Sequence, residues 1–360
     1  MDSYEPLPYR GNLPWLRERT VVCVTHGSTA YGLNTPTSDL DIKGVAVPPA
    51  EYFHGFDKRF EQAESKEPDM VVYDIRKFFA LAAENNPNII EVLWCDESNH
   101  RIVTAAGRRM LDARDLFLSK KARFTFAGYS HAQLKRISTH YRWLKSPPLA
   151  PPTRSELGLP ERTVLPKDQL QAAHSAIEKR LAEWNLDDMS GVEPAERIRL
   201  QNLMADMLTE INITKDEQYR AAARSIGIEE NFLRLLDLER QYRARKTEWE
   251  QYQNWVATRN PARAELESKW GFDTKHAMHL VRLMRMCREI LETGKVIVKR
   301  PDREELLAIR NGAWSYEQLT EWARKQDDEM TALYERSTLR HSADRAVLDA
   351  VCREIVEEMI

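Results

Sequence analysis

The stretch that decides the fold is residues 21–47, VVCVTHGSTAYGLNTPTSDLDIKGVAV. It opens with apolar, mostly β-branched residues at 21–25, a run that is typical of a buried strand. It closes with residues 40–47, where apolar and polar residues alternate as they do in a strand with two different faces. Gly27 comes directly after the first run and lets the backbone turn sharply. The stretch therefore predicts two strands that are connected through a glycine turn.

The segments around this stretch continue an α/β pattern and then become helical. Residues 70–73 predict a third strand, and Asp74 is placed to cap a helix over residues 76–82. A helical pattern runs over 116–144, and six prolines between 146 and 166 then favour an extended connector. Beyond it, apolar residues at helical spacing predict helices over 198–211, 273–293 (ending at Gly294), 314–325 and 342–358.

These patterns predict an α+β protein with a mixed-sheet N-terminal domain followed by a predominantly α-helical domain. The chain has 360 residues, enough for two domains of ordinary size. We expect the catalytic domain to cover residues 1–115, a helix and the proline-rich connector to cover 116–170, and the helical domain to cover 171–360.

Composition narrows the classes of protein that the chain can represent. The formal net charge is only -3, so no global basic field indicates a nucleic-acid binder, although a local basic groove is compatible with it. Four well-separated cysteines predict free thiols instead of a zinc site or a disulfide framework. The polar, proline-dotted N-terminus and the lack of a long apolar run predict a soluble cytoplasmic protein with no membrane contact.

The deciding stretch also carries the residues with the clearest chemistry. Ser28 follows Gly27 and can begin a helix whose free amides bind phosphate. Asp39 and Asp41 are two residues apart, which would place both carboxylates on one face of a strand. Two like charges so close call for a divalent cation, and Mg²⁺ held by carboxylates and nucleotide phosphates suits the pair, with Mn²⁺ as a substitute. The pattern predicts one metal ion that holds a triphosphate and a second that activates a hydroxyl.

Residues 26–33 (HGSTAYGL) and 38–44 (SDLDIKG) resemble the signature of the DNA polymerase beta-like nucleotidyltransferase superfamily. Further segments, 76–79, 86–91, 126–129, 156–160 and 273–283, are similar to a bacterial and phage branch described as predicted RNA-repair nucleotidyltransferases. The superfamily completes its metal site with a third carboxylate on a neighbouring strand. Asp69 and Asp74 are both candidates here, and Asp69 is preferred because Asp74 is explained as a helix cap.

The resemblance implies transfer of NMP from an NTP to a hydroxyl acceptor with release of pyrophosphate. The catalytic and metal-binding residues would be Asp39, Asp41 and Asp69, and the acceptor an RNA 3′-end in repair or a tRNA-like end. Three alternatives stay open: nucleotidylation of a protein or a small molecule, untemplated oligonucleotide synthesis in defence signalling, and a catalytically silent nucleotide sensor.

Other residues are candidates for nucleotide binding beside Gly27 and Ser28. Lys43 alternates with Asp41 and would point toward the same site, and Lys275, His279 and Arg282 fall on one helix face that could contact phosphate or base. The alternative for that face is an ordinary solvated basic surface. Phe124, Phe126 and Tyr129, near basic residues 120–123 and 135–136, offer stacking surfaces for an acceptor, although such aromatics are more often core.

Overall fold

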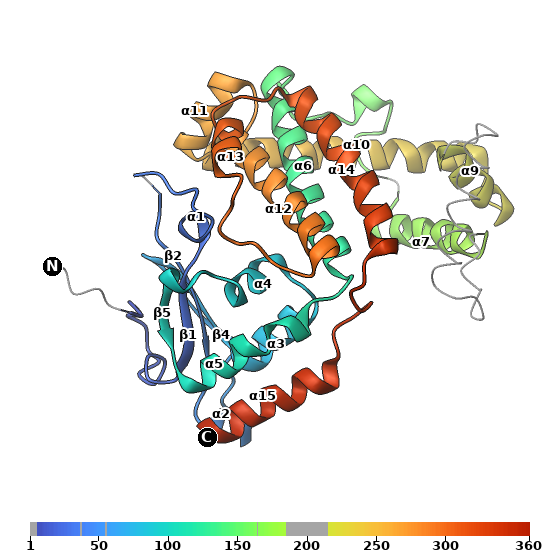
Figure 1. The fold of residues 1–360 in the computed structure, drawn as a ribbon. Helices are drawn as coiled ribbons and strands as arrows, with labels where there is room; N and C mark the ends of the chain where they lie inside the picture. Colours follow the sequence, from blue (N-terminus) through green and yellow to red (C-terminus); the bar gives the residue numbers. More distant parts are fainter. Residues whose placement is uncertain (1–5, 37, 55, 164, 185–214) are drawn as a thin grey trace. The chain divides into compact units, whose positions relative to one another are not determined.

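The computed structural model describes residues 6–36, 38–54, 56–163, 165–184 and 215–360 of the chain (Figure 1). The chain forms two compact units, Met1–Lys145 with Asn260–Ile360, and Ser146–Arg259. The last hundred residues therefore share a unit with the N-terminal sheet, and the predicted domain limits at 115 and 170 stay a prediction. The helix expected over 198–211 lies outside the described residues.

A mixed five-stranded sheet organises the N-terminal part of the first unit, as the sequence predicted. Its order is β3-β4-β2-β1-β5. β2 runs antiparallel to β1 and parallel to β4, while β3 and β5 pair antiparallel at the two edges. The strands are β1 (Thr20–Thr25), β2 (Asp41–Ala46), β3 (Gln62–Lys66), β4 (Asp69–Asp74) and β5 (His100–Val103). The sequence indicated β1, β2 and β4 and missed the more polar edge strands.

The start of β2 differs from the prediction. The strand begins at Asp41, and not at Leu40, because ladder pairing begins where Asp41 meets Asp69 of β4. Leu40 is 41% exposed and, like Asp39, lies in the loop before the strand. The expectation that Asp39 and Asp41 share one strand face is therefore wrong for Asp39, which reaches the site from a loop.

Short helices connect the strands of the sheet. Asp74 caps α3 as predicted, because its carboxylate accepts a hydrogen bond from the Arg76 backbone N–H at 2.7 Å. Asn86 caps α4 in the same way, through the backbone N–H of Asn88. These helices are α1 (Gly27–Ala30), α2 (Glu51–His54), α3 (Ile75–Ala83), α4 (Pro87–Leu93) and α5 (Ala105–Asp112), with 3₁₀ turns at Glu97–Asn99 and Arg114–Phe117.

Six further helices belong to the described part of the first unit. They are α6 (Ala122–Lys145), α11 (Pro261–Trp270), α12 (Thr274–Thr293), α13 (Arg303–Arg310), α14 (Tyr316–Arg336) and α15 (Arg345–Met359). α12 is capped by Asp273 and ends at left-handed Gly294, so the prediction for residues 273–293 is confirmed. Figure 1 shows α12 beside α6, and α15 lying along α3 and α5. The chain thus returns at its C-terminus to the N-terminal sheet domain.

The two faces of the sheet pack into different cores. Val22, Val24 and Val45 belong to a large core that also contains Phe78 of α3 and Leu280 of α12. The alternate residues Cys23, Ile42 and Met70 face a smaller core with Leu7 and Leu16. Because side chains alternate along a strand, Asp41 and Lys43 point to the same side as Val45, toward the helices. All four cysteines are buried and free, as predicted.

The second unit is helical in its described part. It contains a 3₁₀ turn at Ser155–Leu157 within the proline-rich connector, and the helices α7 (Lys167–Trp184), α9 (Lys215–Ser225) and α10 (Glu230–Thr258). Its core includes Leu170, Ile177 and Leu233. No helix within the described ranges of either unit is long and apolar enough to cross a membrane. The cytoplasmic location stays a prediction.

Candidate active site

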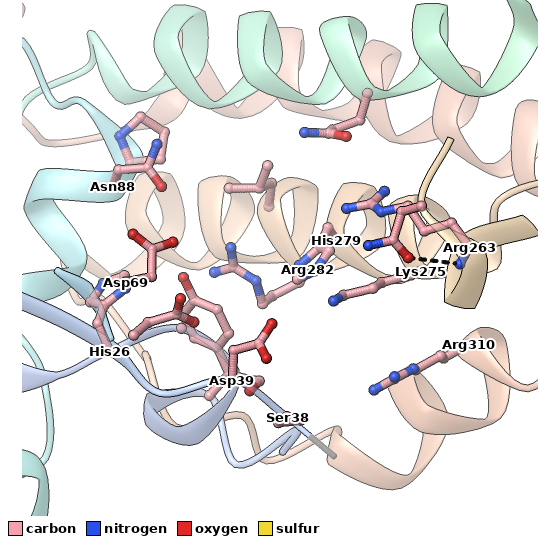
Figure 2. A pocket seen from close by; sticks show the side chains of 18 of the residues that line it. His26, Ser38, Asp39, Asp69, Asn88, Arg263, Lys275, His279, Arg282 and Arg310 are labelled. Atoms are coloured by element: carbon pink, nitrogen blue, oxygen red, sulfur yellow. Dashed lines mark hydrogen bonds between the residues drawn. The ribbon is translucent and has the colours of Figure 1, made fainter. Parts of the chain in front are cut away.

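A cavity of about 970 Å³ in the first unit brings most of the predicted site residues together. The sheet and its loops supply Gly27, Ser28, Asp39, Asp41, Lys43 and Asp69, and the helices supply Lys275, His279 and Arg282. Figure 2 shows Asp39 and Asp69 on one side, with Arg263, Lys275 and Arg310 reaching in from the other. The cavity thus has an acidic sheet wall and a basic helical wall, and its size lies at the upper end of ligand sites.

The glycine turn is tied to the acidic wall. Gly27 has a positive φ of 59°, and a Cβ added to it would lie 1.7 Å from the Asp41 carboxylate oxygen Oδ2. The backbone N–H of His26 also donates to the Asp41 carbonyl at 2.8 Å. Only glycine allows the backbone and the carboxylate to approach so closely. The helix that follows, α1, begins at Gly27 instead of Ser28 and has four residues, so its free N-terminal amides belong to a single short turn.

Asp41 and Asp69 are cross-strand neighbours. They pair in register at the start of the parallel strands β2 and β4, which places both side chains on one face. Burial raises the pKa of the Asp41 carboxyl above its usual range, and the carboxylates of Asp69 and Asp39 raise it further. The acidic wall therefore carries mutually repelling charges that a bound cation would stabilise.

The donor atoms of this wall fit a magnesium ion that is shared with a substrate. In the described part of the chain, no three side chains of His, Cys, Asp or Glu are grouped closely enough to form a metal site alone. A cation bound here needs oxygen ligands from elsewhere. Mg²⁺ commonly combines one or two carboxylates with water and substrate phosphates, and Asp39, Asp41 and Asp69 offer carboxylate oxygens to the same cavity.

The two candidates for the third carboxylate occupy opposite ends of β4. Asp69 is exposed and lines the cavity beside Asp41. Asp74 is 2% exposed, caps α3, and is held by the Arg76 guanidinium through hydrogen bonds of 3.0 and 2.7 Å. Asp74 is therefore a structural residue, which leaves Asp69 as the carboxylate that can reach a ligand in the cavity.

The basic wall comes from three helices. Lys275 and His279 of α12, Arg263 of α11 and Arg310 of α13 all line the cavity. Burial lowers the pKa of Lys275, and the cationic Arg263 and Arg310 lower it further. Burial and nearby cations also hold the pKa of His279 well below its usual range, so His279 is neutral at pH 7. Crowded cations of this kind favour an anionic ligand such as a triphosphate.

Arg282 also borders the cavity, but its charge is committed to a buried cluster. Its guanidinium donates to the carboxylate of Glu91, a residue of α4 with 0% exposure, and its Cζ atom lies 3.7 Å from the centroid of the Tyr31 ring. Tyr31 donates its hydroxyl to the same carboxylate. We call Tyr31, Glu91 and Arg282 the buried triad. It connects α12 to the turn after α1, so Arg282 serves structure at least as much as ligand binding.

Lys43 and the aromatic residues of α6 were the other candidates for ligand contact. Lys43 borders the cavity as predicted, and its Nζ donates to the Asn88 carbonyl at 2.9 Å, while burial lowers its pKa. Among the aromatics, Phe126 is core, Phe124 is 58% exposed, and Tyr129 is 37% exposed and lines the cavity. The roles of the predicted site residues in catalysis and binding stay predictions.

The sequence missed several residues of this site. Glu91 has a signal, since it is the single charge within the apolar run Ile89-Ile90-Glu91-Val92-Leu93, and a buried charge requires a partner. Arg263 and Arg310 have no local signal, because exposed arginines are common on helices and only the fold brings these two to the cavity.

Residues 17–145 match the model of a polymerase beta-like nucleotidyltransferase family. That model is RlaP, described as the RNA repair pathway DNA polymerase beta family, and it covers less than half of the chain. The match confirms the resemblance of this region to that family. It ends at Lys145, so the likeness of residues 156–160 and 273–283 to this branch stays a prediction.

One relative comes from a phage. A stretch of 85 residues is 34% identical to the uncharacterized 38.9 kDa protein in the nrdC-mobD intergenic region of Enterobacteria phage T4. The alignment covers 21% of this chain and 25% of that protein, so the chain spans about a quarter of the length of its relative. No solved structure matches the chain.

Proposed function

We propose that the protein transfers a nucleoside monophosphate from an NTP to the 3′-hydroxyl of an RNA, with Mg²⁺ as cofactor and pyrophosphate as the second product. The observation that carries this proposal is the opposition of two walls in one cavity. Three carboxylates, Asp39, Asp41 and Asp69, face a wall to which Lys275, Arg263 and Arg310 contribute. Such a site suits a ligand that is anionic and is accompanied by a cation.

Different residues of the cavity bind the phosphates and accept the proton in this reaction. Lys275, Arg263 and Arg310 bind the phosphates, and the amides of the Gly27-Ser28 turn add donors from the sheet side. Asp69 accepts the proton of the attacking hydroxyl. The acceptor oxygen then bonds to the α-phosphorus while the bond from that phosphorus to the oxygen of the β-phosphate breaks, and pyrophosphate leaves. Fixing both reactants in one cavity supplies much of the rate enhancement.

Asp39, Asp41 and Asp69 would hold the metal. When bound, Mg²⁺ neutralises charge on the phosphates and makes the acceptor oxygen a better nucleophile. The close approach of the Gly27 backbone to Asp41 supports this role, because one carboxylate oxygen lies beside the Gly27-Ser28 turn.

A labelling experiment tests the proposal. The protein is incubated with Mg²⁺ and each α-³²P-labelled NTP or dNTP, with and without total RNA, and the labelled species is identified on denaturing gels. Label is expected on RNA, and Asp41→Asn should lower it by about 10²- to 10³-fold because it removes one charge from the metal site.

The other outcomes separate the alternatives. Label on protein alone would move the acceptor to an amino-acid hydroxyl, and new labelled oligonucleotides without added RNA would favour a synthase. No label under any condition, with Asp41→Asn behaving like the wild type, would overturn transfer and favour a nucleotide sensor.

A further inference from the structure

One part of the cavity lining consists of neutral side chains, an aromatic ring and carboxamides, that can contact a nucleobase. Tyr129 and Gln133 are four residues apart on α6 and so lie on the same helix face, and Asn88 of α4 is exposed beside them in the cavity lining. We call Asn88, Tyr129 and Gln133 the amide–aromatic end. It consists of one aromatic ring and two carboxamides, whereas the basic wall presents cations.

Two features of this end favour ligand binding: an exposed aromatic ring that is held in place, and an amide oxygen without a hydrogen-bond partner. The Tyr129 hydroxyl accepts a hydrogen bond from the Asn86 amide at 3.1 Å, which fixes a ring that is still 37% exposed. The Gln133 oxygen Oε1 is buried and has no hydrogen-bond partner among the described residues, although it borders the cavity. A buried amide oxygen without a partner is unfavourable until a donor reaches it.

Two residues of the amide–aromatic end lie near Asp69: Asn88, and Tyr129, which is held beside the start of α4 by its hydrogen bond with Asn86. Figure 2 shows Asn88 and Asp69 on the same side, while Lys275 and Arg310 enter from the opposite side. The contact of Lys43 with the Asn88 carbonyl agrees with this, because Lys43 pairs in register with Val71, two residues after Asp69. A nucleoside bound against Tyr129 would therefore lie nearer to Asp69 than to the cations that suit a triphosphate.

We propose that the amide–aromatic end binds the unpaired terminal nucleoside of the acceptor, with its base stacked on Tyr129 and its edge hydrogen-bonded by Gln133. The inference rests on the proposed function, since it assigns the acceptor half of the same cavity. Stacking on an aromatic ring together with hydrogen bonds to a base edge is how proteins read single-stranded ends. A base within a duplex cannot offer its face and its edge in this way.

The test measures acceptor binding apart from transfer. A 5′-fluorescein-labelled 12-nucleotide RNA with a free 3′-hydroxyl is titrated with protein by fluorescence anisotropy, alone and annealed as a blunt duplex. Tyr129→Ala should weaken binding of the single strand by about 5- to 100-fold, and Tyr129→Phe, which keeps the ring, by no more than about twofold. Gln133→Ala should weaken it by about 2- to 10-fold.

Matched controls identify which site a variant affects. Gln62→Ala removes an amide on the edge strand β3, outside the cavity lining, and should bind RNA like the wild type. The affinity for Mg²⁺ and NTP should stay within about twofold in Tyr129→Ala and Gln133→Ala, because the phosphate contacts of the basic wall are intact.

Several results would overturn the inference. If the two variants weaken the NTP and not the RNA, this end holds the base of the nucleotide substrate. If the wild type binds the duplex as tightly as the single strand, or labels only protein, the acceptor is not an unpaired nucleoside. If RNA binding follows the prediction but no labelled NTP is ever transferred, the inference stands and the proposed function fails.

Discussion

The two walls of the cavity are built in different ways. The acidic wall uses residues within 27–69, placed by a glycine turn and by the register of two parallel strands. The basic wall uses residues within 263–310, placed by three helices that reach the sheet domain only through the fold of the unit. The acidic wall is thus encoded locally, whereas the basic wall, to which we assign phosphate binding, depends on tertiary packing.

The largest effect is expected at the buried triad, which joins the two walls. Glu91→Gln keeps the shape of the side chain but leaves Arg282 buried without its carboxylate, and we expect the free energy of unfolding to fall by about 3–5 kcal/mol. Denaturant unfolding measures it. The control is Glu97→Gln, which removes an exposed partner of Arg108 and should change stability by at most about 1 kcal/mol. A loss below about 1 kcal/mol for Glu91→Gln would show that the triad does not hold the walls together.

The second effect concerns the acidic wall alone. Asp69→Asn should lower nucleotidyl transfer by about 10²- to 10³-fold while the protein stays folded, because a charge beside Asp41 is lost. Asp74→Asn should instead lower stability by about 1–3 kcal/mol, since it weakens the cap of α3 and the pair of the buried Asp74 with the half-exposed Arg76, and leave much of the transfer intact. Transfer rates and thermal unfolding are measured for both variants. Loss of transfer in Asp74→Asn alone would reverse the assignment.

A third variant tests the local geometry of the acidic wall. Gly27→Ala places a methyl group against the Asp41 carboxylate, so transfer should fall by about 10²-fold as that group is displaced. Gly32→Ala is the matched control, because Gly32 has a similar φ of 69° but the atom nearest to its added Cβ, Arg303 Cδ, would be 3.9 Å away. Both variants carry about 1–3 kcal/mol of backbone strain. Equal transfer rates in the two variants would show that the turn does not position Asp41.

Local patterns predicted much of the fold and most of the acidic wall. The strands β1, β2 and β4, the Asp74 cap and the Gly294 stop all follow from short-range rules. The polar edge strands β3 and β5 were missed, because their residues pair without a buried apolar pattern. Arg263 and Arg310 were missed for another reason: their place in the cavity is set by packing over long sequence separations, which periodicity along one helix does not encode.

The helix face that carries Lys275, His279 and Arg282 was predicted only in part. Its spacing correctly placed all three residues toward one side of α12, and all three line the cavity. Arg282, however, is only 4% exposed and pairs with Glu91. Helical spacing predicts which side of the helix a side chain faces. It does not predict the residue on another element with which that side chain pairs.

The central claim is that the acidic wall binds a cation and the basic wall binds phosphate. The most direct measurement is calorimetric titration of a non-hydrolysable, α,β-methylene NTP analogue, with and without Mg²⁺, into the wild type, Asp41→Asn and Lys275→Ala. Mg²⁺ should tighten binding to the wild type by about tenfold or more, which is about 1.4 kcal/mol.

The two variants should respond in opposite ways. Asp41→Asn should lose the Mg²⁺ effect and bind the metal-free analogue as well as the wild type or better, because repulsion of the phosphates is reduced. Lys275→Ala should keep the Mg²⁺ effect but bind about tenfold more weakly under both conditions. A full Mg²⁺ effect in Asp41→Asn, or its loss in Lys275→Ala, would contradict the division of the two walls.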